Sequence, residues 1–197
     1  MKKLLITALL ATVAMVPAAA HAQAIPGAVV AVVDLEKITA DCNACRTAKA
    51  ALQSQITSLQ NRQATLAGPL QTEGKSIQTA LDALNGKEPD AALKSRAQAW
   101  ETKRQQAAQE VTRGEQQIQA NSQYVQKQIA DKLGPIYSQV MQKRGANVMV
   151  EIGQTLASGA NLDVTNDVLT ALNAALPSIQ TTAPAAPVTR TNQPQGR

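Results

Sequence analysis

The middle of the chain carries apolar residues spaced alternately four and three positions apart. This spacing averages 3.5 residues, which is typical of helices that pack along a coiled-coil seam. The first run of seam positions comprises Leu52, Ile56, Leu59, Gln63, Leu66, Leu70, Glu73, Ile77, Ala80 and Leu84. The second run comprises Leu93, Ala97, Trp100, Arg104, Ala107, Val111, Gly114, Ile118, Asn121 and Val125. The pattern predicts two long helices.

The segment between the two runs predicts a chain reversal. Residues 85–90 read Asn-Gly-Lys-Glu-Pro-Asp, and Asn-Gly ends a helix and turns the chain. Pro89 suits the first turn of the next helix, where its missing N–H costs nothing. We therefore expect one antiparallel hairpin over residues 43–144 with its tip at 85–89. At 1.5 Å per residue, its helices would be about 60 Å and about 80 Å long.

Two features are expected to weaken this hairpin. Gly68-Pro69 interrupts the first helix and Gly134-Pro135 the second. Each proline removes a backbone hydrogen bond and clashes with the carbonyl four residues earlier, so we expect kinks. Polar seam residues such as Asn121 indicate loose packing. From the sequence, two interpretations stay open: the seam tolerates polar residues without a functional reason, or the loose packing lets the arms bend.

Short apolar segments on both sides of the hairpin predict a small β-containing body. Residues 28–33 are apolar on both faces, as in a strand that is buried on each side, and a short helical turn follows at 35–40. After the hairpin, residues 147–151 predict a second strand and residues 155–157 a third. An amphipathic helix, capped by Asp163 or Thr165 and stopped by Pro177, completes the body.

The fold class expected is α+β, with a body formed by residues 23–42 and 145–177 and one long helical arm. About 60 residues are too few to bury a stable core alone. Association between subunits would complete the core and hide the strand edges. We therefore expect an oligomer of this chain.

Both ends of the chain have distinct compositions. Lys2 and Lys3 precede a short apolar run, and Ala20-His21-Ala22 matches a cleavage site, so residues 1–22 are predicted to be a signal peptide for export. The apolar run is too short to span a bilayer. Residues 178–197 are rich in Thr, Ala, Pro, Gln and Asn with little apolar bulk, which predicts a disordered tail.

Composition argues against catalysis. Cleavage of the signal peptide removes His21, the only histidine, and with it histidine-dependent nucleophiles and histidine-containing metal sites. The chain has no Phe, one Trp and two Tyr, so a compact globule with a deep pocket is not expected. Because clustered carboxylates are also missing from the sequence, we expect neither an enzyme nor a cofactor.

Charge is distributed unevenly along the chain. Residues 46–144 hold 14 basic and 8 acidic residues, whereas the flanking segments 23–45 and 145–179 hold one lysine against six carboxylates. A basic arm attracts acidic polypeptides or an anionic membrane surface. With few aromatic residues and no clustered arginines, nucleic acid is not an expected partner.

Cys42 and Cys45 form a C-x-x-C motif at the start of the first long helix. A helix N-terminus lowers a thiol pKa, but no thioredoxin-like βαβ pattern surrounds the pair. Two cysteines alone do not complete a zinc site, and Arg46 stands where c-type haem attachment needs histidine. A structural disulfide within the chain is the favoured interpretation, and a bond between subunits is the alternative.

Three short segments together resemble the Skp/OmpH family of periplasmic outer-membrane-protein chaperones. They are Val32-Val33-Asp34 with Ile38 following, Arg144-Gly145-Ala146-Asn147, and Leu162-Asp163-Val164-Thr165-Asn166-Asp167-Val168. The resemblance spans residues 29–176. It implies a homotrimer in which three bodies join into a β-barrel and three hairpins enclose a cavity. Members of the family hold unfolded outer-membrane proteins there without ATP. The Gly-Pro pairs, the cysteine pair and the tail depart from the family pattern.

The expected function is that of an ATP-independent periplasmic holdase, and the alternative is a structural periplasmic coiled-coil adaptor. Such adaptors usually carry lipoyl-like β segments and often a membrane tether, which the sequence does not show. Candidate client-facing apolar residues near the tip are Leu70, Ile77, Leu81, Leu84, Leu93 and Trp100. Candidate client-facing cations are Arg96, Lys103, Arg104 and Arg113. For the apolar set the ordinary alternative is packing within the hairpin, and for the cations it is a solvated helix face.

Overall fold

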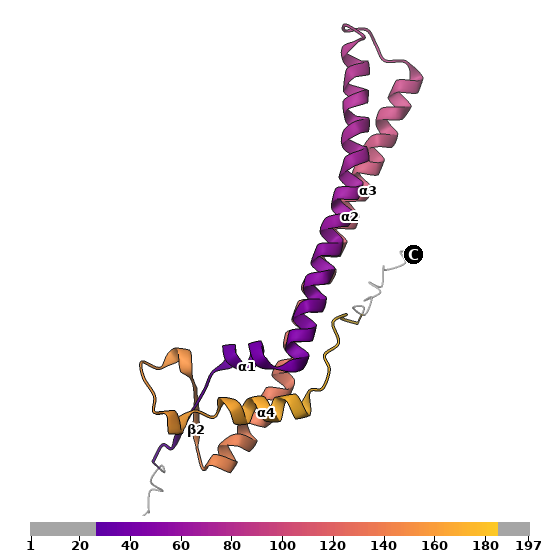
Figure 1. Cartoon of the computed structure of the whole chain (residues 1–197). Coiled ribbons are helices and arrows are strands. Elements are labelled where there is room, and N and C mark those ends of the chain that lie inside the picture. Colours follow the sequence, from indigo (N-terminus) through magenta and orange to yellow (C-terminus); the bar gives the residue numbers. More distant parts are fainter. Residues whose placement is uncertain (1–26, 185–197) are drawn as a thin grey trace, which may run out of the picture.

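The computed structural model describes residues 27–184 and consists of a long helical hairpin rising from a small base (Figure 1). Helices α2 (Asn43–Asp82) and α3 (Ala91–Arg144) form the hairpin. The base contains β1 (Val30–Val33), α1 (Leu35–Asp41), β2 (Val148–Glu151) and α4 (Thr165–Ala175), together with the lower end of α3. The mostly helical chain with one small sheet agrees with the expected class, and the single chain contains a two-stranded sheet. The predicted signal peptide, residues 1–22, lies outside the described residues.

The tip of the hairpin turns through two residues with positive φ. Asn85 has φ 48° and Gly86 has φ 84°, a conformation that these two residue types adopt at low cost. The Asp90 carboxylate then accepts a hydrogen bond of 2.8 Å from the Leu93 N–H and caps α3. The sequence predicted Pro89 in the first turn of this helix. Because the cap is Asp90, Pro89 instead lies just before α3.

Neither Gly-Pro pair breaks its helix. Pro69 lies inside α2 and Pro135 inside α3, and both helices continue on each side of them. Both prolines are exposed, as are Thr65 and Asp131, whose carbonyls lose their usual donor. On the solvent side those carbonyls can bind water, so the helix tolerates the missing bond. Both helices therefore continue through their Gly-Pro pairs, and a kink at these positions stays a prediction.

The sheet joins the two ends of the chain. Strands β1 and β2 pair in parallel, with Val30 opposite Val148 and Val33 opposite Glu151. Ala31, Val32 and Val33 are buried, in line with the expectation of a strand covered on both sides. The other edge of β1 meets the segment before α4, because the Val164 N–H donates to the Val32 carbonyl at 2.9 Å.

The predicted third strand at residues 155–157 is wrong. The chain leaves β2 through a short 3₁₀ turn, Ile152–Gln154, and the Thr155 hydroxyl donates back to the Ile152 carbonyl at 2.8 Å. Leu156 is fully exposed at 108%. A second 3₁₀ turn, Ala160–Leu162, then brings Asp163 to the free edge of β1. The position beside β1 is therefore filled by a bridge at Asp163 and not by residues 155–157.

Helix α4 closes the core of the base. Its Val168 and Leu172 are fully buried. Asp163 accepts a hydrogen bond of 2.8 Å from the Thr165 N–H, and the Thr165 hydroxyl accepts one of 2.9 Å from the Asp34 N–H. These bonds tie the start of α4 to the end of β1. The buried cluster comprises Ala31, Val33, Ile38, Cys42, Ala44, Cys45, Leu133, Ile136, Val140, Val164, Val168, Leu172 and Leu176.

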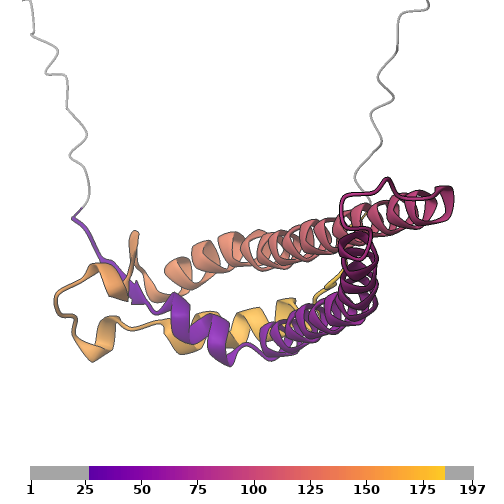
Figure 2. The same cartoon turned by 90° about the horizontal axis from the view of Figure 1, so that it is seen from above.

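The start of the expected disordered tail is ordered. After α4, residues 178–184 run in an extended conformation back along the hairpin, where they make hydrogen bonds to both α2 and α3. Figure 2 shows this segment between the two helices. The prediction of disorder from residue 178 onward is therefore wrong for 178–184, because neutral polar residues of the hairpin bind this segment through its backbone. Residues 185–197 lie outside the described part of the chain.

Candidate functional site on the helical arm

The seam of the hairpin follows the predicted repeat but is only partly buried. Of its 20 positions, all except Gln63 and Arg104 are half-buried or buried. Between residues 49 and 120 the single side chain that is buried is Ile77, at 5% exposure. One hairpin by itself therefore leaves much of its apolar seam in partial contact with water.

Five of the six candidate apolar residues lie within this seam. Ile77 is buried, and Leu70, Leu84, Leu93 and Trp100 are half-buried. Leu81 is half-buried beside the seam. Near the tip, the two helices border an open hollow of about 450 Å³, whose lining residues are Ala80, Leu84, Glu88, Asp90, Ala92, Leu93 and Arg96. The structure thus brings three of the candidate residues, Leu84, Leu93 and Arg96, to one shared surface.

Trp100 holds the upper part of the hairpin together. Its indole N–H donates to the Leu70 carbonyl of α2 at 2.8 Å. The ring lies against Gly74, where an added Cβ would come within 3.0 Å of Trp100 Cζ2. The Arg104 guanidinium lies 5.9 Å from the ring centroid, at cation–π range. Sequence reasoning did not identify Gly74, although a glycine facing the single tryptophan across a seam is a signal of close approach.

Gly114 has a similar role lower in the hairpin. An added Cβ at this seam position would lie 2.5 Å from Leu59 Cδ1. The missing side chain therefore makes room for Leu59 of α2. A glycine that weakens the seam pattern in the sequence is, in the structure, a site of close helix contact.

The four candidate cations divide into two pairs. Arg96 makes a forked contact with Glu73 at 2.6 and 3.1 Å, and Arg104 binds Glu101 at 2.8 Å. Lys103 and Arg113 are exposed and have no salt bridge within the described part of the chain. Two of the candidates thus have their charge largely matched by a carboxylate, and two present it to solvent.

The paired carboxylates titrate below their ordinary range. Hydrogen bonds from the Arg104 guanidinium and then from the Gln105 amide lower the pKa of Glu101 to about 2. The hydrogen bond from Arg96 likewise lowers the pKa of Glu73. Because hydrogen bonds to the charged form favour that form, both side chains stay ionised at neutral pH.

A second ion pair across the hairpin was not foreseen. Arg62 of α2 contacts Glu110 of α3 through Nε at 2.6 Å and Nη2 at 3.2 Å. This forked geometry orients the two helices as well as attracting them. The residues are 48 positions apart, and no local pattern in the sequence pairs them. Together with Arg96–Glu73, it links α2 and α3 at two levels.

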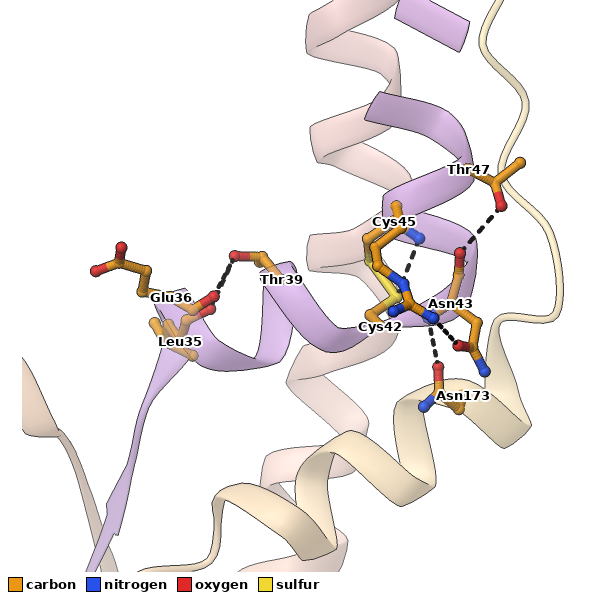
Figure 3. The surroundings of a disulfide bond; sticks show 9 residues. Leu35, Glu36, Thr39, Cys42, Asn43, Cys45, Thr47 and Asn173 are labelled. Carbon is orange, nitrogen blue, oxygen red and sulfur yellow. Dashed lines mark hydrogen bonds between the residues drawn. A yellow bond between two sulfur atoms is a disulfide. The ribbon is translucent and has the colours of Figure 1, made fainter. Parts of the chain in front are cut away.

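A disulfide joins Cys42 to Cys45 at the root of the arm (Figure 3). Cys42 ends α1 and caps α2, and both cysteines are buried. The Asn43 N–H donates to the Asn173 side chain of α4 at 2.9 Å, so the junction also contacts the base. The bond lies where α1 turns into the long α2, within the buried core. Among the described residues, no group of three or more potential ligands is placed to hold a metal ion.

Comparison with protein families gives a match to a model described as outer membrane protein (OmpH-like), over residues 29–172. The chain belongs to the OmpH-like family. The matched range runs from β1 through the whole hairpin into α4. A crystal structure of a chain described as a candidate OmpH-like outer membrane chaperone from Caulobacter crescentus CB15 is similar to this OmpH-like chain, with a TM-score of 0.67 and 18% identity. The similarity covers 83% of this chain and 94% of that one, and it supports the fold. Comparison with curated proteins finds no match.

Proposed function

We propose that this OmpH-like protein is an ATP-independent periplasmic holdase that binds unfolded outer-membrane proteins between the helical arms of a homotrimer. Membership of the family supports a chaperone role in general. The observation that carries the more specific proposal is the half-buried seam of the arm between residues 49 and 120. An arm of this length with so little of its own apolar surface covered is suited to many weak contacts with a non-native chain.

The contacts offered by the arm are of two kinds. The seam provides partly exposed leucine, isoleucine and alanine side chains, each worth little alone but additive over a long client. Lys103 and Arg113 provide positive charge outside the ion pairs. Charge of this kind attracts an acidic client at a distance and raises the rate of encounter. Neither kind of contact requires a defined client sequence.

Features of the base support association between copies. Val29 is 51% exposed, Val148 is 39% exposed and Leu156 is fully exposed. Within the described residues β2 pairs only with β1, so one edge of β2 is open. Exposed apolar side chains beside an open strand edge favour pairing with a further subunit. The family resemblance suggests three copies, whose joined sheets would form the proposed barrel.

Two observations support a periplasmic location. Residues 1–22 have the composition of an export signal, and a structural disulfide is typical of proteins in an oxidising compartment. Within the described residues, no helix has both the length and the apolar character needed to cross a bilayer.

The test is a dilution experiment. An outer-membrane barrel protein unfolded in urea is diluted into buffer with or without the purified mature chain, and light scattering is followed. Suppression at a ratio near three chains per client is expected for a homotrimeric holdase. Scattering that is the same with the chain as with an unrelated protein would reject the holdase and favour the structural adaptor.

A matched pair of variants tests the role of the arm charges. Lys103→Gln with Arg113→Gln removes two free cations from the arm, whereas Lys132→Gln with Lys143→Gln removes two exposed lysines near the base. We expect the arm variant to slow client association at low salt by about 2- to 10-fold, because encounter rates depend on local charge. The base variant should bind clients at close to the parental rate. Equal effects of the two variants would contradict a specific role for the arm.

A further inference from the structure

The segment that follows α4 is bound to the hairpin as an extended peptide. Along residues 179–184 the side chains alternate, with Ile179, Thr181 and Ala183 half-buried and the intervening residues exposed. This alternation is typical of an extended chain with one face against a surface. In Figure 2 the segment lies between α2 and α3, and hydrogen bonds from both helices hold it there.

Three side chains of the hairpin, Gln55, Asn121 and Gln128, bind this segment and are called here the amide clamp. The Gln128 carboxamide donates to the Gln180 carbonyl at 2.8 Å and accepts from the Gln180 N–H at 3.0 Å. This pair of hydrogen bonds to one residue matches the pair that a neighbouring β-strand would make. Gln55 donates to the Thr181 carbonyl at 3.1 Å, and Asn121 accepts from the Ala183 N–H at 2.8 Å.

The amide clamp contacts only the backbone of its ligand. Among the hydrogen bonds of the described residues, none uses a side chain of residues 178–184. The inward side chains beyond Ile179 are Thr181 and Ala183, which are small. A site that binds peptide groups and places small side chains at its inward positions recognises an extended backbone more than a particular sequence.

The amide clamp is also organised without the tail. Asn121 is 3% exposed, and its side chain accepts from Gln117 and donates to Gln55, both at 2.8 Å. Gln128 also donates to the Tyr124 carbonyl at 3.1 Å. When the tail leaves, each of the three side chains keeps a partner within the hairpin. Release of the tail therefore leaves no side chain of the amide clamp without a hydrogen-bond partner. A buried polar group without a partner would raise the free-energy cost of releasing the tail.

We propose that the amide clamp is a binding site for extended polypeptide, occupied by the chain's own tail and vacated when a segment of an unfolded client takes its place. This proposal rests on the proposed holdase function and specifies how one part of the arm recognises its client. A tethered tail has an effective concentration in the millimolar range, so it competes with any client segment. The tail would therefore lower client affinity until a long client, with many extended segments, displaces it.

Two truncations test this proposal. A chain ending at Ile179 loses the bound residues but keeps Ile179, which packs against the core of the base. A chain ending at Pro184 loses only residues 185–197 and keeps all four backbone contacts, so it is the matched control. Binding is measured by fluorescence anisotropy of a labelled outer-membrane barrel protein diluted from urea. The chain ending at Ile179 is expected to bind about 3- to 10-fold more tightly than the full mature chain, since its site is fully available.

A second pair of variants assigns the gain to the amide clamp. In the chain ending at Ile179, Gln128→Ala should remove the gain in client affinity. Gln126→Ala should preserve that gain, because Gln126 is exposed and makes no contact with the tail. In the full chain, hydrogen exchange at the Gln180 and Ala183 amides should become faster when the client binds. Both amides are hydrogen-bonded to the clamp in the free protein.

The outcomes separate this proposal from the holdase function. If the full chain suppresses aggregation but the chain ending at Ile179 binds the client no more tightly, the amide clamp is not a client site and the holdase stands. Unchanged exchange at Gln180 and Ala183 on client binding leads to the same conclusion. If no version of the chain suppresses aggregation, the proposed function fails, and the clamp loses its proposed ligand with it.

Discussion

The base and the arm of this molecule contain similar apolar residues but bury them to different degrees. In the base, 13 residues from β1, α1, α4 and the neighbouring ends of α2 and α3 form one buried cluster. In the arm, Ile77 is the single buried side chain from residue 49 to residue 120. The base thus approaches the packing of a globular core within one chain. The arm depends on a half-buried seam, two cross-hairpin ion pairs and a few close contacts at glycine.

This difference indicates how stability and function are divided. Regions with few buried contacts open locally at low free energy, whereas a dense core opens only with global unfolding. A rigid base keeps the root of the arm in place, and a loosely packed arm can adapt its surface, as the proposed binding of clients requires.

The largest effect is expected in the core of the base. Leu172 is fully buried, so Leu172→Ala should lower the free energy of unfolding by about 2–5 kcal/mol, through lost burial and the cavity left behind. Leu66 is half-buried in the arm, and Leu66→Ala should cost less than half as much. Urea denaturation at fixed protein concentration compares the two. Equal losses would show that the arm is as tightly packed as the base.

The disulfide is expected to contribute less than a core leucine. Its two cysteines are three positions apart, and closing so short a loop stabilises by about 2 kcal/mol in the chain-entropy treatment. Reduction should therefore lower the free energy of unfolding of the parent by about that amount. A Cys42→Ser, Cys45→Ser chain should not respond to the reductant. Two free thiols in the untreated parent by mass spectrometry would contradict an intrachain bond.

Because Gly114 is closely packed, a substitution there is expected to change the free energy of unfolding by about 1 kcal/mol. Gly114→Ala places a Cβ against Leu59, so despite better helix propensity it should destabilise the protein by roughly that amount. In a Leu59→Ala background the clash is gone, and the same change should stabilise by up to about 1 kcal/mol. A double-mutant cycle in urea measures this reversal. The same sign in both backgrounds would mean that the hairpin moves apart to accept the side chain.

The smallest effect concerns the titration of Glu101. Its pKa is about 2 in the folded protein, below the ordinary value of 4.5. The folded state therefore gains stability above pH 4.5 and loses that gain as the pH falls from 4.5 to 2. An NMR titration should find the pKa near 2 in the parent. In Arg104→Gln it should rise toward the ordinary value, and in Gln105→Ala it should rise less. A parental pKa near 4.5 would show that the Arg104 contact is not maintained in solution.

Much of the arm was predictable because its signals are local. The 3.5-residue repeat identified both helices and nearly all of the seam, and Asn85-Gly86 located the turn. The contributions of single residues were harder to predict. Asn121 and Gly114 look like defects in a list of seam positions, yet Asn121 binds the tail and Gly114 admits Leu59. Their partners are far away in sequence, so no local pattern reveals them.

By itself, the sequence determined the elements whose causes lie within a few residues: the long helices, the turn at the tip and the buried strand β1. The tertiary structure alone decided the parallel pairing of β1 with β2, the bridge at Asp163 in place of a third strand, and the binding of residues 178–184 to the hairpin. These contacts join segments that lie from 52 to 131 residues apart in the sequence. The physical reason is that hydrophobic spacing and capping act over one or two turns. By contrast, a strand edge and a side-chain amide both form hydrogen bonds with backbone groups, so their partner depends on which segment the fold places beside them.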